Sequence, residues 1–292
     1  MLPKLSSAMP SQIANREAAR GTILNYVLCG EWRSGLTMLQ SSLSQLPGVV
    51  CHRDLLFDEY GTPEEQDDFR KAEHEAYYGS IKYPDIKQLL PEWFSPPING
   101  NLYRYLTDQV FDNPRHRETK VGIRLLYRQA EQYSLYDLFR ERCREGDFCL
   151  IHLHRNPIKC FLSLERAKRS RIWRRVASKR QRVVFLPVMV TLPELVGFIR
   201  RYEMIRRKID DSCRDVLDIR YKDLVDNYAS SFARVMRFLE IDKTAIDGEV
   251  PLPLFSRLTS LSLKRQIINY DELNKKLPKD MQRYLTEEED DG

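Results

Sequence analysis

The chain alternates short, continuously apolar segments with longer segments whose apolar residues recur at helical spacing. The apolar segments are 23–29, 48–52, 120–127, 148–154 and 216–220. The helical patterns cover 36–46, 64–77, 101–111, 134–144, 157–170, 192–213 and 223–240. Strands that are apolar on both faces and separated by helices are typical of a parallel sheet covered on both sides. We therefore predict an α/β protein with a central parallel sheet flanked by helices.

No repeat or low-complexity linker divides the chain into smaller units. Its 292 residues are 42% hydrophobic and 30% charged, which is typical of a globular protein with a sizeable core. We expect an N-terminal extension over residues 1–22, a single domain over 23–280 and an acidic, disordered tail over 281–292. The proline-rich stretch 81–100 is predicted to be an irregular excursion from the sheet.

Features that the sequence lacks predict the compartment and the absence of a metal. No apolar run approaches the roughly 20 residues that span a bilayer, and the first residues lack the apolar core of a secretory signal. None of the six cysteines forms a C-x-x-C pair, and none of the five histidines belongs to an H-E-x-x-H pattern. We interpret the cysteines as reduced core thiols of a cytoplasmic protein, with disulfides or a metal site as the alternatives. No metal is expected.

A basic stretch, "RAKRSRIWRRVASKRQR", covers residues 166–182. Nine of its seventeen residues are Lys or Arg and none is acidic. Such a stretch is either a solvated surface or a contact with an anionic partner, including the surface of a membrane. We expect no nucleic acid partner.

The segment "YVLCGEWRSGLTMLQ" (26–40) places a tight turn between a buried strand and a helix. Backbone N–H groups at the start of a helix and the helix dipole together form a site for an anion such as phosphate. Arg33 adds a permanent positive charge, and Thr37 adds a hydroxyl in the first helical turn. The alternative is an ordinary connection with a surface arginine. The pattern G-x-x-x-x-G-K-[ST] of nucleoside triphosphate loops fails because Leu36 replaces the lysine.

A second strand end repeats this arrangement in "FCLIHLHRNPIKCFLSLERAKRS". Arg155 follows the strand, Pro157 stands at a favoured first helical position, and Ser163 lies eight residues after Arg155. Eight residues are a little over two helical turns, so Ser163 can lie on the same side of the helix as Arg155. Alone, Arg155 is equally well explained as a salt-bridge residue. The two strand ends together predict a ligand with two separated phosphates.

These motifs resemble those of the sulfotransferases. "WRSGLTML" is similar to their 5′-phosphosulfate loop, and "RNPIKCFLS" is similar to their 3′-phosphate element. Three further stretches, "KVGIRLLYRQ", "RYKDLVDNY" and "KRQIINYDEL", resemble the bacterial carbohydrate sulfotransferases of the nodulation-factor, lipopolysaccharide and trehalose type. The similarity runs from about residue 23 to 277. It implies a P-loop-like sulfotransferase fold and the sulfuryl donor 3′-phosphoadenosine-5′-phosphosulfate (PAPS).

The resemblance also assigns roles to individual residues. Arg33 would hold the 5′-phosphate and the sulfonate, and Arg155 with Ser163 would bind the 3′-phosphate. Tyr221 would contact the adenine. The 5′-phosphate would be cradled by the backbone amides and hydroxyls of Ser34, Gly35, Leu36, Thr37 and Met38. The nucleotide site would be closed from the C-terminal side by Lys264, Arg265 and Gln266. Where the family usually has Thr or Ser, this chain has Leu36, which removes one hydroxyl contact.

The implied reaction is in-line transfer of the sulfuryl group from PAPS to a hydroxyl acceptor, a carbohydrate or a glycolipid. An acceptor hydroxyl has to lose a proton, so a general base is expected. In the similar enzymes this base follows the second strand, where the present chain reads "GVVCHRDLLFDEY". Asp54 is the first candidate and His52 the second. The alternative role for Asp54 is the N-cap of a helix.

Two other functions are compatible with the same motifs. One is a different phosphoryl- or nucleotide-handling enzyme with the same type of sheet, against which the missing loop lysine argues. The other is a non-enzymatic protein of the same fold that binds PAPS, its product or an anionic polymer. Leu36 is the feature that favours this second alternative.

Overall fold

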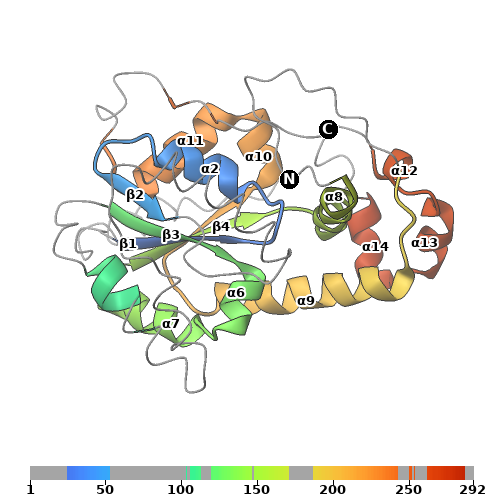
Figure 1. Cartoon of the computed structure of the whole chain (residues 1–292), viewed down its shortest axis with the longest axis horizontal. Coiled ribbons are helices and arrows are strands. Elements are labelled where there is room, and N and C mark those ends of the chain that lie inside the picture. The colour runs from blue at the N-terminus through green and yellow to red at the C-terminus, as the bar shows by residue number, and fades with distance from the viewer. Residues whose placement is uncertain are drawn as a thin grey trace, which may run out of the picture.

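The computed structural model describes most of the domain, including a five-stranded sheet (Figure 1). The described residues are 25–52, 103, 106–112, 120–146, 148–170, 187–242, 250, 251, 253 and 262–286. The strands are β1 (Asn25–Gly30), β2 (Val49–His52), β3 (Lys120–Leu126), β4 (Phe148–His154) and β5 (Val216–Arg220). All adjacent strands are parallel. The predicted parallel sheet is therefore confirmed, whereas the predicted segments 64–77 and 81–100 lie outside the described residues.

The strand order is β2-β3-β1-β4-β5, so the first strand of the chain lies in the centre. After β1 the chain builds β2 and β3 on one side and then β4 and β5 on the other. The carboxyl ends of β1 and β4 are level, since Gly30 pairs with Leu153. Ligands bind outside the carboxyl ends of such strands, at the point where the order reverses. That point lies beside the end of β1.

Helices cover both faces of the sheet (Figure 1). On one face lie α2 (Leu36–Leu43), α10 (Tyr221–Asp226) and α11 (Tyr228–Phe238). On the other lie α6 (Tyr127–Gln132), α7 (Tyr136–Glu145) and α9 (Leu192–Asp210). Successive residues of β1 point to opposite faces, so Val27 packs with the second group of helices and Leu28 with the first. This is why the strand could be continuously apolar.

A third apolar cluster lies beside the sheet, around α8 (Pro157–Ser170). The C-terminal helices pack here with the start of α9 (Figure 1). They are α12 (Leu263–Gln266), α13 (Tyr270–Lys276) and α14 (Lys279–Thr286). The tail predicted from residue 281 was therefore placed too early. Met281, Tyr284 and Leu285 recur at helical spacing and are buried in this cluster, so they belong to the folded domain.

Several predicted helices differ in extent from those observed. The pattern over 223–240 is two helices, α10 and α11, because Asn227 has non-helical dihedral angles between them. The pattern over 192–213 ends at Asp210, and that over 101–111 contains a π-helix, η1 (Leu106–Phe111). Among the described residues, no helix is both long enough and apolar enough to cross a membrane.

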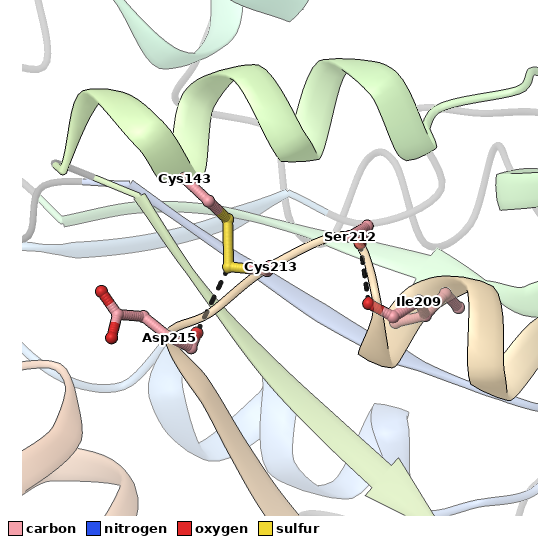
Figure 2. The surroundings of a disulfide bond; sticks show 5 residues. All are labelled: Cys143, Ile209, Ser212, Cys213 and Asp215. Atoms are coloured by element: carbon pink, nitrogen blue, oxygen red, sulfur yellow. Dashed lines mark hydrogen bonds between the residues drawn. A yellow bond between two sulfur atoms is a disulfide. The ribbon is translucent and has the colours of Figure 1, made fainter.

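A disulfide joins Cys143 on α7 to Cys213, which follows α9 (Figure 2). Their Cα atoms are 5.6 Å apart although 70 positions separate them in the sequence. The prediction of six reduced thiols was therefore wrong for this pair. It failed because the two cysteines meet only when α7 and the end of α9 pack on the same face of the sheet. The other four cysteines are buried and form no disulfide in the described part of the chain: Cys29, Cys51, Cys149 and Cys160.

Candidate functional site

The turn after β1 is held in a conformation that only a few residues adopt. Arg33 has φ 71° and Gly35 has φ 97°, both in the left-handed region, which is strained for the non-glycine residue. Helix α2 then begins with hydrogen bonds from the N–H groups of Met38 and Leu39 to the Gly35 carbonyl. The Ser34 amide donates to the Glu31 carbonyl at 3.2 Å. The amides of Gly35, Leu36 and Thr37 have no earlier helical turn to bind, so they can donate to an anion at the helix start.

Two glycines allow this turn to pack closely. A Cβ atom on Gly30 would lie 2.6 Å from Ser34 Oγ and 2.8 Å from the Leu153 carbonyl oxygen. A Cβ atom on Gly35 would lie 3.0 Å from the ring of Tyr221. The sequence therefore places glycine where the turn meets both β4 and the start of α10.

The structure brings Arg33, Arg155 and Ser163 together. Arg33 Nε donates a hydrogen bond to Ser163 Oγ at 2.9 Å. Arg155 Nη1 donates to the Arg33 carbonyl oxygen at 2.7 Å. Two hydrogen bonds thus join the turn after β1 to the segment that contains Arg155 and the start of α8. The sequence predicts that both strand ends bind one ligand. That prediction requires the two ends to lie side by side, and they do.

The side chain and the backbone of Arg155 are held by two tyrosines. Its guanidinium lies over the ring of Tyr221, 4.2 Å from the centroid, as in a cation–π contact. The hydroxyl of Tyr202 donates to the Arg155 carbonyl at 2.9 Å and accepts from its N–H at 3.4 Å. Burial raises the pKa of Tyr202, so the hydroxyl stays protonated. Tyr202 was missed in the sequence because it lies 47 residues away, within an ordinary helical pattern.

Arg124 on β3 is a second residue that the sequence analysis did not single out. Its Nη1 donates to Thr37 Oγ1 at 3.0 Å, and its side chain is buried. Because Thr37 accepts from Arg124, its own hydroxyl proton can be donated to a ligand. The signal was present as an arginine inside the apolar strand "KVGIRLLY".

The hydroxyl missing at position 36 has a structural explanation. The Leu36 side chain is 4% exposed and packs in the core between α2 and the sheet. Ser34, by contrast, has a buried hydroxyl without a hydrogen-bond partner in the described part of the chain. Leu36 therefore strengthens the packing beneath the turn, while its backbone amide keeps its place in the first turn of α2.

The three residues predicted to close the site lie on α12. Gln266 is buried, and its Oε1 accepts a hydrogen bond from Arg166 Nη1 at 2.6 Å. Arg166 lies on α8 one turn after Ser163, and burial, together with the charge of Arg155, lowers its pKa to about 10. The side chains of Lys264 and Arg265 are exposed. The structure thus connects Gln266 to α8 through Arg166.

Of the two candidates for the general base, the structure describes only His52. His52 is buried at the carboxyl end of β2, where it pairs with Ile123 of β3. Since Ile123 also pairs with Val27, His52 is level with a residue three positions before the end of β1. Asp54 lies outside the described residues.

Comparison with known proteins decides the family. The family described as Sulfotransferase family matches the chain over residues 27–245. The chain belongs to this family. A sulfotransferase structure from Alicyclobacillus acidocaldarius is 16% identical, with a TM-score of 0.41, and the alignment covers 78% of this chain and 83% of that chain. The sulfotransferase domain of the Synechococcus PCC 7002 olefin synthase is 17% identical, with a TM-score of 0.40, and the alignment covers 85% and 82%. No curated protein matches the chain.

Family membership and the observed sheet together confirm the predicted α/β fold. They also establish the general chemistry of this sulfotransferase, the transfer of a sulfuryl group. The matched region contains both strand-end elements and Tyr221, and it ends before α12. Lys264, Arg265 and Gln266 therefore lie outside the segment that defines the family here.

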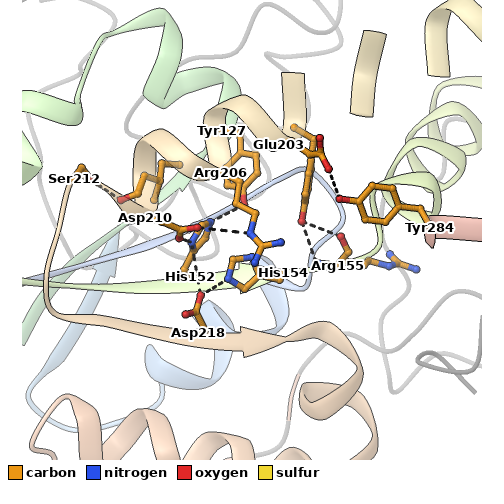
Figure 3. A network of polar contacts seen from close by, with 12 residues as sticks. Tyr127, His152, His154, Arg155, Glu203, Arg206, Asp210, Ser212, Asp218 and Tyr284 are labelled. Carbon is orange, nitrogen blue, oxygen red and sulfur yellow. Dashed lines mark hydrogen bonds and ion pairs between the residues drawn. The ribbon is translucent and has the colours of Figure 1, made fainter. Parts of the chain in front are cut away.

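A network of polar side chains lies beside the site, on the face of the sheet covered by α9 (Figure 3). His152 Nδ1 lies 2.7 Å from Asp210 Oδ1, and its Nε2 lies 2.6 Å from the Tyr127 hydroxyl. Burial lowers the pKa of His152 to about 4, although the hydrogen bond with Asp210 opposes this shift. His154 Nε2 contacts Asp218 Oδ1, and this contact lowers the pKa of Asp218.

Proposed function

We propose that this sulfotransferase transfers the sulfuryl group of PAPS to a hydroxyl acceptor. The observation that carries the proposal is the contact of Arg33 with Ser163 and of Arg155 with the Arg33 carbonyl, at 2.9 and 2.7 Å. A donor with phosphates at both its 5′ and 3′ positions needs two cationic elements side by side. The ends of β1 and β4 provide them.

The residues of the β1 turn fit the 5′-phosphate. Ser34 Oγ is a buried donor without a partner in the described part of the structure, and a phosphate oxygen would be its acceptor. Thr37 is oriented by Arg124 so that its hydroxyl proton can be donated. The N–H groups at the start of α2 add the positive end of the helix dipole.

The residues after β4 fit the 3′-phosphate. Arg155 Nε is buried without a partner in the described part of the structure, and the guanidinium is otherwise held by Tyr221 and the Arg33 carbonyl. Ser163 accepts from Arg33, so its own proton can be donated to the phosphate. We assign Tyr221, whose ring packs against the Arg155 guanidinium, to contact with the base of the nucleotide. Lys264 and Arg265 are exposed cations that we assign, with Gln266, to the C-terminal border of the nucleotide site.

When bound, PAPS supplies an activated sulfuryl group whose leaving group is the 5′-phosphate. Arg33 keeps its charge at any physiological pH, so it stabilises the negative charge that grows on the leaving group and cannot act as an acid. Positioning and electrostatic stabilisation supply most of the catalysis in such transfers. Asp54, or His52 in its place, removes the acceptor proton. No step requires a metal ion.

We propose a carbohydrate or a glycolipid as the acceptor, on the basis of the sequence resemblance to the bacterial carbohydrate sulfotransferases. The basic stretch 166–182, apart from the buried Arg166, supports an anionic acceptor or a peripheral contact with a membrane surface. We also propose that the enzyme works in the cytoplasm, although a disulfide such as Cys143–Cys213 is rare in that compartment.

Two measurements test the donor and the reaction. PAPS, or its desulfated product, should raise the melting temperature of the protein more than ATP does, because ATP lacks the 3′-phosphate. Equal shifts would contradict the assignment of Arg155 and Ser163. A screen of hydroxyl acceptors with sulfate-labelled PAPS should then identify the molecules that gain sulfate. Binding of the product without transfer to any acceptor would instead favour the non-enzymatic binding protein.

A further inference from the structure

Two histidines and two aspartates converge outside the nucleotide site, where β4, β5 and α9 end. They are His152, His154, Asp210 and Asp218, and each offers one ligand atom within 4.8 Å of the other three. Figure 3 shows their side chains pointing toward one another from the three elements. We propose that these four residues bind one divalent transition-metal cation, with Zn²⁺ as the best match.

The arrangement of the strands creates this convergence. His152 and His154 are two positions apart on β4, so both point to the same face of the sheet. Asp218 is the partner of His152 in the register of β4 with β5, and it points to this face as well. Asp210, the last residue of α9, reaches the same place from the helix that covers this face.

The four ligand atoms lie close enough together to surround one cation, although the two His–Asp pairs are at hydrogen-bond distance and would have to separate. Metal bonds of about 2.0–2.1 Å place neighbouring ligands about 3.3–3.5 Å apart. His152 Nδ1 lies 2.7 Å from Asp210 Oδ1 and 3.9 Å from Asp218 Oδ1. His154 Nε2 is in contact with the same oxygen of Asp218. Small shifts of the side chains, well under 1 Å each, would suit a cation among them.

Two further residues orient the ligands through their other atoms. The Tyr127 hydroxyl lies 2.6 Å from His152 Nε2, which directs Nδ1 toward the carboxylates. Arg206 Nε lies 3.7 Å from Asp210 Oδ2, which leaves Oδ1 for the cation. Such outer partners are typical of metal-binding histidines and carboxylates. Imidazole nitrogen with carboxylate oxygen suits Zn²⁺ better than Mg²⁺ or Ca²⁺, which prefer oxygen ligands alone.

The position of the cation predicts its role. His154 directly precedes Arg155, and Asp210 lies eight residues after Tyr202, which holds the backbone of Arg155. A cation would therefore fasten the ends of β4 and β5 to α9, beneath the residue that we assign to the 3′-phosphate. This role is structural. It does not depend on the proposed donor, so a failure of either proposal leaves the other intact.

Zinc titration of the purified protein tests the proposal. The protein is kept without thiol reductant, so that the disulfide stays closed, and is treated with a chelator that is then removed. Calorimetric titration with Zn²⁺ should show one ion per chain and a higher melting temperature, because binding stabilises the native state. The absence of stoichiometric binding would overturn the proposal. X-ray absorption at the zinc edge should show imidazole nitrogen and oxygen around the ion, and sulfur ligands would also overturn it.

Variants locate the ion. His154→Ala and Asp218→Asn should each weaken Zn²⁺ binding at least tenfold and abolish the zinc-dependent rise in melting temperature. Asp211→Asn is the matched control, because it removes an exposed carboxylate next to Asp210 and should leave binding unchanged. Each variant is first shown to be folded in the chelator. If the cluster is only a pair of His–Asp hydrogen bonds, the variants will lower stability without changing zinc binding, and the proposal fails.

Discussion

Arg33 and Ser163 are joined by a hydrogen bond of 2.9 Å between Nε and Oγ, although 130 residues separate them in the sequence. Arg33 belongs to the turn after β1, and Ser163 lies on the helix after β4. The two elements that we assign to the two phosphates of the donor therefore share a direct contact. A change at Arg33 is expected to affect both.

Replacement of Arg33 separates binding from catalysis. Arg33→Ala should lower turnover at saturating PAPS, because the charge that Arg33 stabilises grows in the transition state. Arg33→Lys keeps the charge but lacks the Nε donor to Ser163, so it should recover only part of the activity. Steady-state kinetics with varied PAPS check both. A change in apparent affinity alone, at normal turnover, would show that Arg33 is not catalytic.

Replacement of Arg155 should act mainly on donor binding. Arg155→Ala removes a charge-assisted contact worth about 1.5–3 kcal/mol, so the Kd for PAPS should rise by roughly 10- to 100-fold. Turnover at saturation should change much less. Arg169→Ala, at an exposed position on α8, is the matched control and should bind PAPS normally. A similar loss in both variants would indicate a general effect of charge and not a site.

The strands could be predicted closely because each is a short apolar run between helical patterns. β5 was predicted with its observed bounds, and β2 within one residue. The break between α10 and α11 was missed because the helical spacing of apolar residues continues through Asn227. Nothing in that spacing indicates the non-helical dihedral angles of this residue. The disulfide between Cys143 and Cys213 depends on the packing of α7 against the end of α9, which the sequence does not display.

The residues of the candidate site could be predicted where a sequence motif directly follows a predicted strand. Arg33, Arg155 and Ser163 follow buried strands, and parallel strands bring their carboxyl ends to one edge. Tyr202 and Arg124 could not be assigned in this way, because each acts through a contact with a residue far away in the sequence. Tyr202 binds the backbone of Arg155, and Arg124 binds the Thr37 hydroxyl. Tyr202 leaves no local pattern, and an arginine inside the apolar strand 120–127 marks Arg124 as unusual without showing its partner.

The disulfide should contribute measurably to stability. Cys143→Ser opens a loop between positions 70 apart, and it should lower the free energy of unfolding by about 2–4 kcal/mol in denaturant titration. Thiol reductant should lower the stability of the native sequence toward that of the variant and leave the variant unchanged. Protein unfolded without reductant should titrate with four thiols. Six thiols would show that the bond is not formed.

A side chain should destabilise the protein more at Gly35 than at Gly146, which has a similar φ. Gly35→Ala and Gly146→Ala both place alanine at a positive φ, which costs about 1–3 kcal/mol. Only at Gly35 does the new Cβ meet another group, the ring of Tyr221 at 3.0 Å. Gly35→Ala should therefore be the less stable variant and should also bind PAPS more weakly. Equal stability losses with normal PAPS binding would contradict the close packing of the turn on Tyr221.

Asp54→Asn tests the general base. The substitution keeps the shape of the side chain and nearly all its packing but removes its basicity. If Asp54 takes the acceptor proton, turnover should fall by about 10²–10⁴-fold while the affinity for PAPS stays close to that of the native protein. If Asp54 is only a helix N-cap, stability and turnover should both survive, because Asn caps helices about as well as Asp.

His52→Gln is the companion to Asp54→Asn, since His52 is buried at the carboxyl end of β2. A large loss of turnover in His52→Gln, with Asp54→Asn near normal, would transfer the role of base to His52. Melting temperatures measured alongside the kinetics distinguish this outcome from a loss of folding, because a destabilised β2 would lower both. Normal turnover in both variants would exclude both residues. The proton would then have to be accepted by a group that neither the sequence nor the fold has indicated.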